Sequence, residues 1–406
     1  MSDPMVIVGA GQAGLQLAES LRAEGWQGPI RLIGAETHAP YHRPPLSKAW
    51  LLGEAVEAQI TIRGPEFFAR KGLELETGTR VVAIDRAART ITFADGRVEV
   101  WAGLALTTGA AARRLSMPGA ELAGVLTLRD LDDASRLHGR LVPGARLVVI
   151  GAGFIGLEVA AAAVKREVEV TVIEAASRPM ARVVSEPISA FYTDLHARNG
   201  VRIVTDAAVT GLIGDAMGHV RSVATSAGEF PADLVLVGVG AVARDDLAAA
   251  AGLACDRGIV VDACARTSDP AIVAAGDCTV RRRVDGSLVR LESVQNAVEQ
   301  AKSAAAALMG RDRPFEATPW FWSDQYGVKL QMVGTSAGHD HMRLRGDPGE
   351  GRFSIFYWRD GRLIGVDSVD RAQDHLAARK ILDRGLDLAP EAVADPAVDL
   401  GAFARG

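Results

Sequence analysis

Residues 5–14 read MVIVGAGQAG, an apolar run that leads into three glycines with the spacing GxGxxG. The apolar run predicts a β-strand, and the residues that follow, QAGLQLAESLRAEGW (12–26), predict a helix with one apolar face. At this spacing the first glycine permits a tight turn, the second lets the backbone approach a pyrophosphate, and the third lets the helix pack closely on the strand. The stretch therefore predicts a β-α unit that binds a dinucleotide at the start of its helix.

The same plan returns at residues 146–156, RLVVIGAGFIG, ahead of an alanine-rich helix. In both copies a second predicted strand follows and ends in an acid: Glu36 ends IRLIGAE (30–36), and Glu174 ends VTVIE (170–174). A carboxylate at this place accepts a hydrogen bond from a ribose hydroxyl. The chain is thus predicted to hold two dinucleotides, each on its own Rossmann-like domain.

Two dinucleotides on one chain indicate hydride transfer between a resident cofactor and a co-substrate. We expect FAD at the first site and a nicotinamide at the second. Glu174 favours NADH, because its charge would repel the 2′-phosphate of NADPH, although Arg178 and Arg182 nearby leave room for NADPH. The sequence thus predicts an NADH-dependent flavoprotein oxidoreductase.

The order of the motifs predicts an α/β fold in which the NAD domain is inserted in the FAD domain, followed by a smaller domain. We expect the FAD-binding domain at 1–109 and 241–316, the NAD-binding domain at 110–240 and a C-terminal α+β domain at 317–406. The last part carries the strand patterns FSIFYW and RLIGVDSV and the helix pattern QDHLAARKILDRG.

Composition limits the class of partner. The chain has 406 residues, 48% of them hydrophobic and 23% charged, and a net charge of −5 at pH 7. A slightly acidic chain argues against a nucleic-acid binder. No secretory leader and no run of 18 apolar residues occurs, so we expect a cytoplasmic protein that spans no membrane. The cysteines, Cys255, Cys264 and Cys278, form no CxxC or CxxxxC pair, which predicts neither a disulfide framework nor a metal site.

Further motifs give the chain a family. It carries PYHRPPLSKAWL (40–51), TSDPAIVAAGDC (267–278), VRLESVQNAVEQA (289–301) and PWFWSDQY (319–326) in this order between and after the two glycine motifs. With them the sequence resembles, over nearly its whole length, the FAD-dependent, NADH-using ferredoxin reductases of bacterial oxygenase systems, the putidaredoxin reductase type. The wider fold that this resemblance implies is that of the two-dinucleotide flavoproteins such as glutathione reductase.

The resemblance implies two candidate catalytic residues, Lys48 and Glu158. The segment RPPLSK would pack against FAD, with Lys48 near the flavin edge that receives the hydride and Glu158 as its ionic partner. Glu158 is expected on the first turn of the second glycine-motif helix. Pro44 and Pro45, which fix φ and remove two donors, are expected to hold the segment extended.

The resemblance also implies the residues that bind the cofactors. Those expected at FAD are Gly9, Gly11, Ala13, Gly14, Glu36, Arg43, Lys48, Val81, Arg129, Asp277, Val294 and Trp322. Those expected at NAD are Gly151, Gly153, Ile155, Gly156, Glu174, Arg182 and Gly240. One departure concerns the ribose contact: close members often have an aspartate where this chain has Ala35, so the contact is assigned to Glu36.

The positions of the cysteines indicate how electrons are expected to leave the flavin. Disulfide reductases of this fold place a cysteine pair beside the flavin, where this chain has Pro44 to Ser47. Electrons are therefore expected to pass from FAD directly, one at a time, to a [2Fe-2S] ferredoxin that serves a cytochrome P450 or a ring-hydroxylating dioxygenase. Two alternatives stay open: an NADH oxidase or peroxidase, which the missing cysteine disfavours, and a non-enzymatic NADH-sensing flavoprotein like apoptosis-inducing factor.

Two surface features have simple interpretations. Arg281, Arg282 and Arg283, with Arg311 and Arg313, form a candidate positive rim for an acidic ferredoxin, although solvated basic turns explain each of them as well. His339 and His341 in GHDH are expected to be solvated turn residues rather than metal ligands. No metal site is expected.

Overall fold

The structure is a computed structural model that describes residues 3–283, 285–315, 317–395 and 398–405. The chain forms two compact units. Unit 1 comprises residues 1–42, 57–111 and 241–317, and unit 2 comprises residues 43–56, 112–240 and 318–406. Three ends of the predicted domain segments lie outside the described residues: Met1, Glu316 and Gly406. The predicted division into FAD, NAD and C-terminal domains stays a prediction.

Unit 1 is built on a parallel five-stranded sheet in the order β19-β7-β1-β2-β3. Its strands are β1 (Met5–Val8), β2 (Ile30–Ile33), β3 (Leu73–Glu76), β7 (Gly103–Leu106) and β19 (Ile272–Ala274). Strand β1 lies in the centre, with Ile7 opposite Leu32 of β2 and Ala105 of β7. All four residues of β1 are buried, as expected of a central parallel strand.

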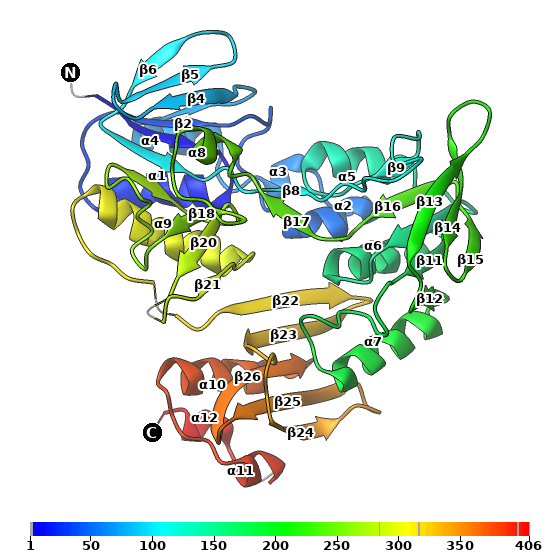
Figure 1. Cartoon of the computed structure of the whole chain (residues 1–406). Helices are drawn as coiled ribbons and strands as arrows, with labels where there is room; N and C mark the ends of the chain where they lie inside the picture. The colour runs from blue at the N-terminus through cyan, green and yellow to red at the C-terminus, as the bar shows by residue number, and fades with distance from the viewer. Residues whose placement is uncertain (1–2, 284, 316, 396–397, 406) are drawn as a thin grey trace. The chain divides into compact units, whose positions relative to one another are not determined.

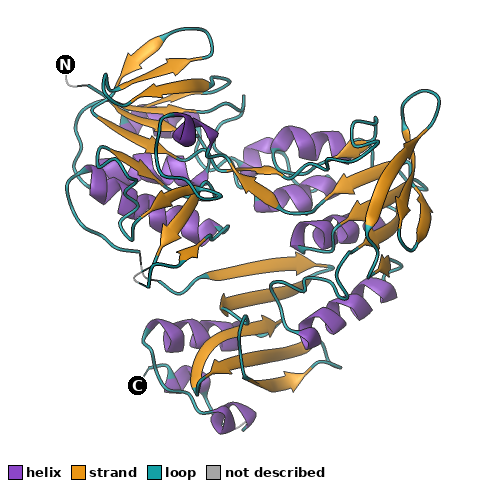
Figure 2. Cartoon of the chain, in the orientation of Figure 1, coloured by secondary structure: helices purple, strands orange, loops and turns teal. Residues whose placement is uncertain are grey.

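Two helices pack together on this sheet (Figures 1 and 2). They are α1 (Gln12–Ala23), which follows the first glycine motif, and α9 (Val294–Leu308). Ala13 and Ala18 of α1 share one apolar cluster with Ala301 of α9. Their small side chains let the two helices lie close to each other and to the strands.

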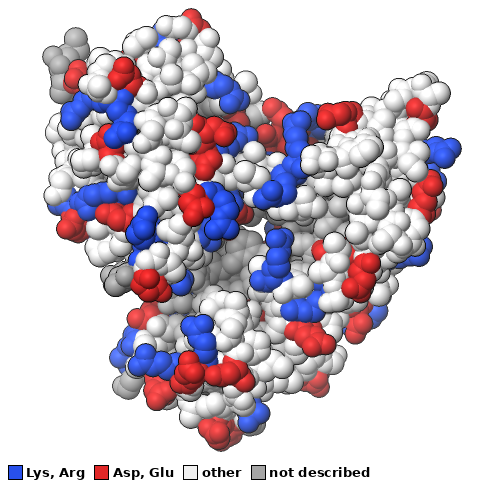
Figure 3. Space-filling view, viewed as in Figure 1, with Lys and Arg blue, Asp and Glu red and all other residues white. Residues whose placement is uncertain are grey.

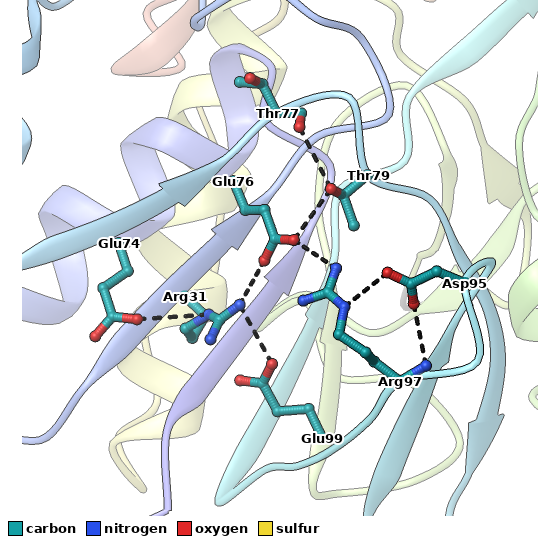
Figure 4. A network of polar contacts seen from close by, with 8 residues as sticks. All are labelled: Arg31, Glu74, Glu76, Thr77, Thr79, Asp95, Arg97 and Glu99. Atoms are coloured by element: carbon teal, nitrogen blue, oxygen red, sulfur yellow. Dashed lines mark hydrogen bonds and ion pairs between the residues drawn. The ribbon is translucent and has the colours of Figure 1, made fainter.

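A three-stranded antiparallel sheet covers another part of unit 1. It has the order β4-β5-β6, with β4 (Val81–Asp85), β5 (Thr90–Phe93) and β6 (Val98–Val100). Ion pairs join it to β2 and β3 (Figure 4): Arg31 lies 2.5 Å from Glu76, 3.4 Å from Glu99 and 3.6 Å from Glu74, and Arg97 lies 2.7 Å from Glu76. The hydrogen bond from Arg97 is the main cause that lowers the pKa of Glu76. These contacts fix the edge strand β3 against the second sheet.

Unit 2 contains a second parallel five-stranded sheet, in the order β12-β11-β10-β16-β9. Its strands are β9 (Val125–Leu126), β10 (Arg146–Ile150), β11 (Glu169–Ile173), β12 (Arg202–Val204) and β16 (Leu234–Val237). Helix α6 (Phe154–Lys165) follows the second glycine motif, and α7 (Glu186–Arg198) lies between β11 and β12 in sequence. A small antiparallel sheet, β13 (Val209–Gly214), β14 (Val220–Thr225) and β15 (Gly228–Pro231), is inserted before β16.

The C-terminal part of unit 2 is an antiparallel five-stranded sheet in the order β22-β23-β26-β25-β24. Its elements are β22 (Trp320–Gln325), β23 (Val328–Gly334), β24 (His341–Asp347), β25 (Arg352–Arg359), β26 (Arg362–Val369) and the helix α10 (Ala372–Asp383), which packs on β23 and β26. Trp358 and Phe356 of β25 share a core with Ile381 of α10. The strands and the helix predicted from the sequence here are confirmed.

The remaining elements are short. They are η1 (Pro44–Ser47), α2 (Ala49–Leu52), α3 (Glu57–Ile60), α4 (Pro65–Lys71), β8 (Ala110–Ala112), α5 (Leu131–His138), β17 (Ala241–Ala243), α8 (Asp246–Ala250), β18 (Ile259–Val261), β20 (Thr279–Arg282), β21 (Leu288–Val289), α11 (Pro390–Ala394) and α12 (Leu400–Phe403). Of the helices in the described ranges, none has the length and apolar content that a membrane span needs. The predicted α/β fold class is confirmed.

A buried carboxyl in the C-terminal sheet makes stability depend on pH. Asp367 of β26 is 4% exposed, and its Oδ2 accepts a hydrogen bond of 2.8 Å from the Tyr357 hydroxyl. Burial raises the pKa of Asp367 to about 7. Since the unfolded carboxyl titrates near 4, the native state binds the extra proton between these values, and stability falls as pH rises from about 4 to about 7.

We therefore expect Asp367→Asn to stabilise the protein by roughly 4 kcal/mol at pH 8 and by only about 1 kcal/mol at pH 5. Urea unfolding at the two pH values measures the difference. The control is Asp374→Asn, which breaks an ion pair of 2.9 Å with Arg371 and should destabilise at both pH values. Equal effects of Asp367→Asn at pH 5 and pH 8 would contradict the pKa shift.

Candidate functional site

The first glycine loop lies between β1 and α1 and is shaped by close backbone contacts. Gly9 has φ +118°, and a Cβ on it would lie 2.1 Å from the carbonyl oxygen of Thr107. A Cβ on Gly14 would lie 2.0 Å from the carbonyl oxygen of Gly9. The Thr107 hydroxyl donates a hydrogen bond of 2.7 Å to that same oxygen. Packing within the protein therefore requires the first and third glycines.

The second loop, between β10 and α6, has the same construction. Gly151 has φ +100°, and its Cβ would lie 2.6 Å from the carbonyl oxygen of Gly238. A Cβ on Gly156 would lie 2.2 Å from the carbonyl oxygen of Gly151. The two fingerprints thus fold into equivalent strand-turn-helix units, one in each unit of the chain.

The middle glycine of each loop is not required by packing within the protein. Gly11 and Gly153 are the N-caps of α1 and α6, and both have extended backbone that any residue adopts. A Cβ on either would meet no atom within 4 Å. Nothing in the described protein excludes a side chain there, which fits a pyrophosphate that approaches the backbone at the start of each helix. Ile155, in the first turn of α6, is 43% exposed.

Glu174 is held at the second loop by the backbone. Its Oε2 accepts a hydrogen bond of 2.8 Å from Ala152 N, between the glycines, and its Oε1 accepts one of 2.9 Å from Ala176 N. The carboxylate therefore lies at the loop that the sequence assigns to NAD. Its two backbone bonds fix its position without neutralising its charge.

The two arginines after Glu174 differ. The Arg178 guanidinium donates to the carbonyl oxygens of Val184 and Ala181 and to the Ser189 hydroxyl, at 2.6 to 3.0 Å, so it is used within the fold. Both arginines line a groove of about 420 Å³, in which Arg178 is half-buried and Arg182 is exposed. Of the two arginines that leave room for NADPH, Arg182 is the more exposed.

Gly240 follows β16 at the limit of unit 2. It has φ +105°, and a Cβ on it would meet no atom within 4 Å. Its assignment to the NAD site stays a prediction, as do all the assigned roles of single residues.

Unit 1 brings several of the predicted FAD residues together. A Cβ on Gly276 would lie 3.1 Å from the Ala13 side chain, so the turn that contains Asp277 lies against the first glycine loop. The Glu36 loop is close as well, because a Cβ on Gly34 would lie 2.8 Å from the Ala10 side chain. Glu36 accepts a hydrogen bond of 2.6 Å from the Tyr41 hydroxyl.

Two more predicted FAD residues belong to this unit. Val294 is the first residue of α9, where Ser293 caps the helix by accepting a hydrogen bond from Asn296 N. A 15-residue helix that begins here presents the positive end of its dipole, which can stabilise negative charge. Val81 begins β4 and is 8% exposed, in the apolar cluster that includes Val8.

The segment RPPLSK differs from its prediction. Pro44 and Pro45 do not hold it extended; they open the 3₁₀ helix η1, with Arg43 as its N-cap. Proline suits a first turn because its fixed φ is helical and the N–H that it lacks has no partner there. The turn ends at Lys48, whose N–H donates to the carbonyl oxygen of Pro45.

The two candidate catalytic side chains form an ion pair. Lys48 Nζ lies 2.5 Å from Glu158 Oε2 and 3.3 Å from the carbonyl oxygen of Pro44. The side chain of Glu158 is 2% exposed and that of Lys48 is 22% exposed. Glu158 lies in the second turn of α6, not in the first, since the helix begins at Phe154. A buried carboxylate thus holds the lysine at the end of η1.

Two serines that the sequence analysis missed complete the environment of Glu158. The Ser47 hydroxyl donates to Oε2 at 2.5 Å, and the Ser323 hydroxyl donates to Oε1 at 2.6 Å. Both serines are buried. No local pattern marks Ser323, because its buried position in the strand WFWSDQ follows from the fold. With Lys48, these donors satisfy both oxygens of the carboxylate.

Three more predicted FAD residues lie in unit 2: Arg43 just before η1, Arg129 between β9 and α5, and Trp322 on β22. Arg43 Nη1 donates a hydrogen bond of 2.7 Å to the carbonyl oxygen of Arg129, so these two residues are neighbours. Trp322 lies on β22 next to Ser323, and successive side chains of a strand point to opposite faces. The ring centroid of Trp322 lies 5.5 Å from that of Trp320.

The surface features are less uniform than predicted. His341 is not a turn residue: it lies in β24, with its ring centroid 5.9 Å from that of Trp358. His339 is partly buried and bonds the carbonyl oxygen of Ser336. Within the described ranges, no group of three potential metal ligands occurs.

The candidate arginine rim is partly used within the fold. Arg281 donates to the carbonyl oxygen of Phe315, and Arg311 pairs with Glu24 at 2.7 Å, whereas Arg282, Arg283 and Arg313 are exposed. On the face shown in Figure 3, basic and acidic side chains are interspersed.

The cysteines lie far in sequence from η1 and are not paired. Cys278 is fully buried and Cys264 is 9% exposed, while Cys255 is partly exposed. Burial raises the pKa of the Cys278 thiol. A buried, protonated thiol is a poor nucleophile, which agrees with a structural use of Cys278.

Comparison with known proteins identifies the class. Residues 3–301 match the family described as pyridine nucleotide-disulphide oxidoreductase, and residues 320–404 match the reductase C-terminal family. Rhodocoxin reductase of Rhodococcus erythropolis is 46% identical over 98% of this chain and 93% of its own. The ferredoxin–NAD(+) reductase component of the anthranilate 1,2-dioxygenase system of Burkholderia cepacia is 41% identical over 99% of each chain.

A solved structure agrees over the full length. The reductase in the crystal structure of the covalent putidaredoxin reductase–putidaredoxin complex is 41% identical and superimposes with a TM-score of 0.96, over 100% of this chain and 99% of the other. The chain belongs to the pyridine nucleotide-disulphide oxidoreductases and, within them, to the ferredoxin reductases of the putidaredoxin reductase type. It is an oxidoreductase with FAD as cofactor and NADH as co-substrate, which confirms those predictions.

Proposed function

We propose that the protein passes electrons from NADH, through FAD, to a [2Fe-2S] ferredoxin, and that this ferredoxin serves a cytochrome P450 or a ring-hydroxylating dioxygenase in the cytoplasm. One NADH then reduces two ferredoxins and releases one proton. Support comes from relatives of nearly equal length that are named as ferredoxin reductase components of dioxygenase systems. FAD, when bound, accepts two electrons as hydride and releases them singly.

The observation that carries the proposal is the environment of Lys48. The segment before it, Pro44 to Ser47, contains no thiol, and its last side chain is used to hold Glu158. Lys48 is a fixed cation at the end of a rigid turn, paired with a buried carboxylate. Such a pair supplies a positive charge next to a site that gains negative charge, which is electrostatic catalysis without a covalent step.

The other residues bind and orient. We propose that the first glycine loop, with Glu36 and Asp277, holds FAD in residues 1–109 and 241–316, and that the second loop, with Glu174, holds NADH in residues 110–240. Hydride transfer needs no side-chain acid or base, so the contribution of this chain is to place the two reacting rings and to fix charge around them. The open space over Gly11 and Gly153 supports this assignment.

The proposal is tested by an anaerobic titration of the FAD-loaded protein with NADH and, separately, NADPH, followed by oxidised [2Fe-2S] ferredoxin. We expect flavin absorbance to bleach near one equivalent of NADH, little response to NADPH and rapid return of the colour with ferredoxin. Colour that stays bleached after ferredoxin would contradict the reductase and favour an NADH-sensing flavoprotein. Recovery only with O₂, and formation of water or peroxide, would favour an oxidase.

Nucleotide preference gives a prediction for Glu174. Glu174→Gln keeps an acceptor for one backbone N–H but removes the charge that repels a 2′-phosphate. We expect the ratio of kcat/KM for NADPH to that for NADH to rise about 10-fold, the size of one lost charge contact. Glu169→Gln, at the exposed start of the same strand β11, is the control and should leave the ratio unchanged. An unchanged ratio in Glu174→Gln would remove the assigned role.

A further inference from the structure

A chain of hydrogen bonds continues from Glu158 into the fold beyond Ser323. Gln325 Nε2 donates to the Ser323 hydroxyl at 3.2 Å, and Gln325 Oε1 lies 2.7 Å from His196 Nε2. The Tyr326 hydroxyl lies 3.1 Å from His196 Nδ1. The chain runs from α6 through β22 to α7, and four of its side chains, those of Glu158, Ser323, Gln325 and His196, are almost fully buried.

The direction of every bond follows from the chemistry of the groups. The amide oxygen of Gln325 only accepts, so His196 donates from Nε2. Burial lowers the pKa of His196, so the ring is neutral and Nδ1 accepts from the Tyr326 hydroxyl. Ser323, which accepts from Gln325, donates to Glu158. Each link therefore donates toward the same carboxylate, and such aligned dipoles strengthen one another and stabilise its negative charge.

The turn after β22 supports a specific use of Tyr326. Residues 326 and 327 join β22 to β23, and both have positive φ: +55° at Tyr326 and +85° at Gly327. A two-residue turn of this kind normally takes asparagine, aspartate or glycine at its first position, because an aromatic residue is strained there. The strained position brings the Tyr326 ring to a centroid distance of 5.0 Å from that of His196. The contact gives a reason for a tyrosine in this turn.

We propose that His196, Gln325 and Ser323 are positioning residues of the flavin site, which hold the Glu158 carboxylate in one orientation and, through it, the ammonium of Lys48. This inference rests on the proposed function. His196 acts through two other side chains and from a different helix. Because these hydrogen bonds keep Glu158 ionised and in one orientation, the ammonium of Lys48 stays in place while the flavin is reduced and reoxidised.

Within the described part of the chain, two titratable side chains interact with this carboxylate, those of Lys48 and Tyr192. Lys48 pairs with it directly. Tyr192, one turn before His196 on α7, is buried close by: burial, and then neighbouring carboxylates that include Glu158, raise its pKa. Among the described residues, the Tyr192 hydroxyl has no hydrogen-bond partner, so it is near the chain without being part of it.

The test compares Ser323→Ala, Gln325→Leu and His196→Phe in the FAD-loaded protein. Stopped-flow mixing with NADH separates the limiting rate of flavin reduction from the Kd of NADH, and a dye-coupled titration measures the flavin reduction potential. We expect the limiting rate to fall about 10-fold in Ser323→Ala, with smaller losses in the other two variants, since a hydrogen bond to a charged group is lost directly only in the first. The potential should become more negative in the same order, with the Kd of NADH unchanged.

Two variants separate positioning from stability. His196→Gln can place an amide N–H donor near the position of Nε2, which faces Gln325, and should recover most of the rate and potential lost in His196→Phe. Tyr192→Phe, a change in the same helix, should leave both quantities unchanged. Wild-type potential and limiting rate in His196→Phe and Ser323→Ala would overturn the inference, as would an equal shift in Tyr192→Phe. If NADH does not reduce the wild-type flavin at all, the proposed function fails instead, and the inference with it.

Discussion

Lys48→Met is expected to lower the limiting rate of flavin reduction by NADH about 100-fold while FAD remains bound. The variant removes the only cation with which Glu158 pairs among the described residues, and it leaves a carboxylate of 2% exposure without its ionic partner. Loss of one charge-assisted contact at a site where negative charge develops costs on the order of 3 kcal/mol in the barrier. Stopped-flow absorbance at 450 nm under argon measures the rate.

The same change should also destabilise the protein, since a buried charge without a partner costs about 3 to 5 kcal/mol. The double variant Lys48→Met/Glu158→Leu removes both charges, so we expect it to recover stability without recovering rate. This separates the electrostatic role from the structural one. Lys302→Met, which breaks an ion pair with Glu299 on the unit 1 helix α9, serves as the control for loss of a lysine and should leave the rate unchanged. A single variant that reduces as fast as wild type would show that Lys48 is only structural.

Gly153→Val is expected to raise the Kd of NADH at least 100-fold with the fold and the flavin intact. Gly153 has extended backbone, and its missing Cβ points into space with no atom within 4 Å. The Cβ of a valine would therefore meet no atom of the described protein, and the side chain would stand in the space where we propose that the pyrophosphate lies. Two backbone contacts to a charged group correspond to roughly 3 kcal/mol or more, which is a factor of about 100 in Kd.

The neighbouring glycine is the matched control. Gly156→Val forces a side chain to within 2.2 Å of the Gly151 carbonyl oxygen. We therefore expect it to destabilise the parallel sheet of unit 2 and to lower the temperature of thermal unfolding. Gly11→Val makes the equivalent change at the first loop. It should weaken the binding of FAD, while the helix content measured by circular dichroism stays unchanged. Wild-type affinity for NADH in Gly153→Val would mean that the pyrophosphate does not lie over that helix.

Local sequence predicted the parts of the site that depend on adjacent residues. The two glycine loops, the strands before them and the acid after each second strand are defined within about 30 residues, and φ and close packing at Gly9 and Gly151 explain why. The pairing of Lys48 with Glu158 is a contact between residues 110 positions apart. No periodicity gives such a contact, and it was inferred only through resemblance to a family.

Other features of the site depend on tertiary contacts, so local sequence patterns could not predict them. Pro44 and Pro45 fit an extended segment and a first helical turn equally well, and tertiary packing selected the turn. The polar residues Ser323 and Gln325 occur in a strand with aromatic neighbours, and their use became visible only when α6 and α7 were placed against it. His341 was assigned to a turn because the sequence does not show where β24 begins.

Unit 2 is built from three segments that lie far apart in the sequence, so its parts are synthesised at different times. Lys48 and Glu158 leave the ribosome long before Ser323, which lies 165 residues after Glu158. Until that residue has been synthesised, Oε1 of Glu158 lacks the protein donor that it has in the folded chain. The charged centre of the reductase is therefore completed only late in translation, and a nascent chain that already carries both glycine loops does not yet contain it.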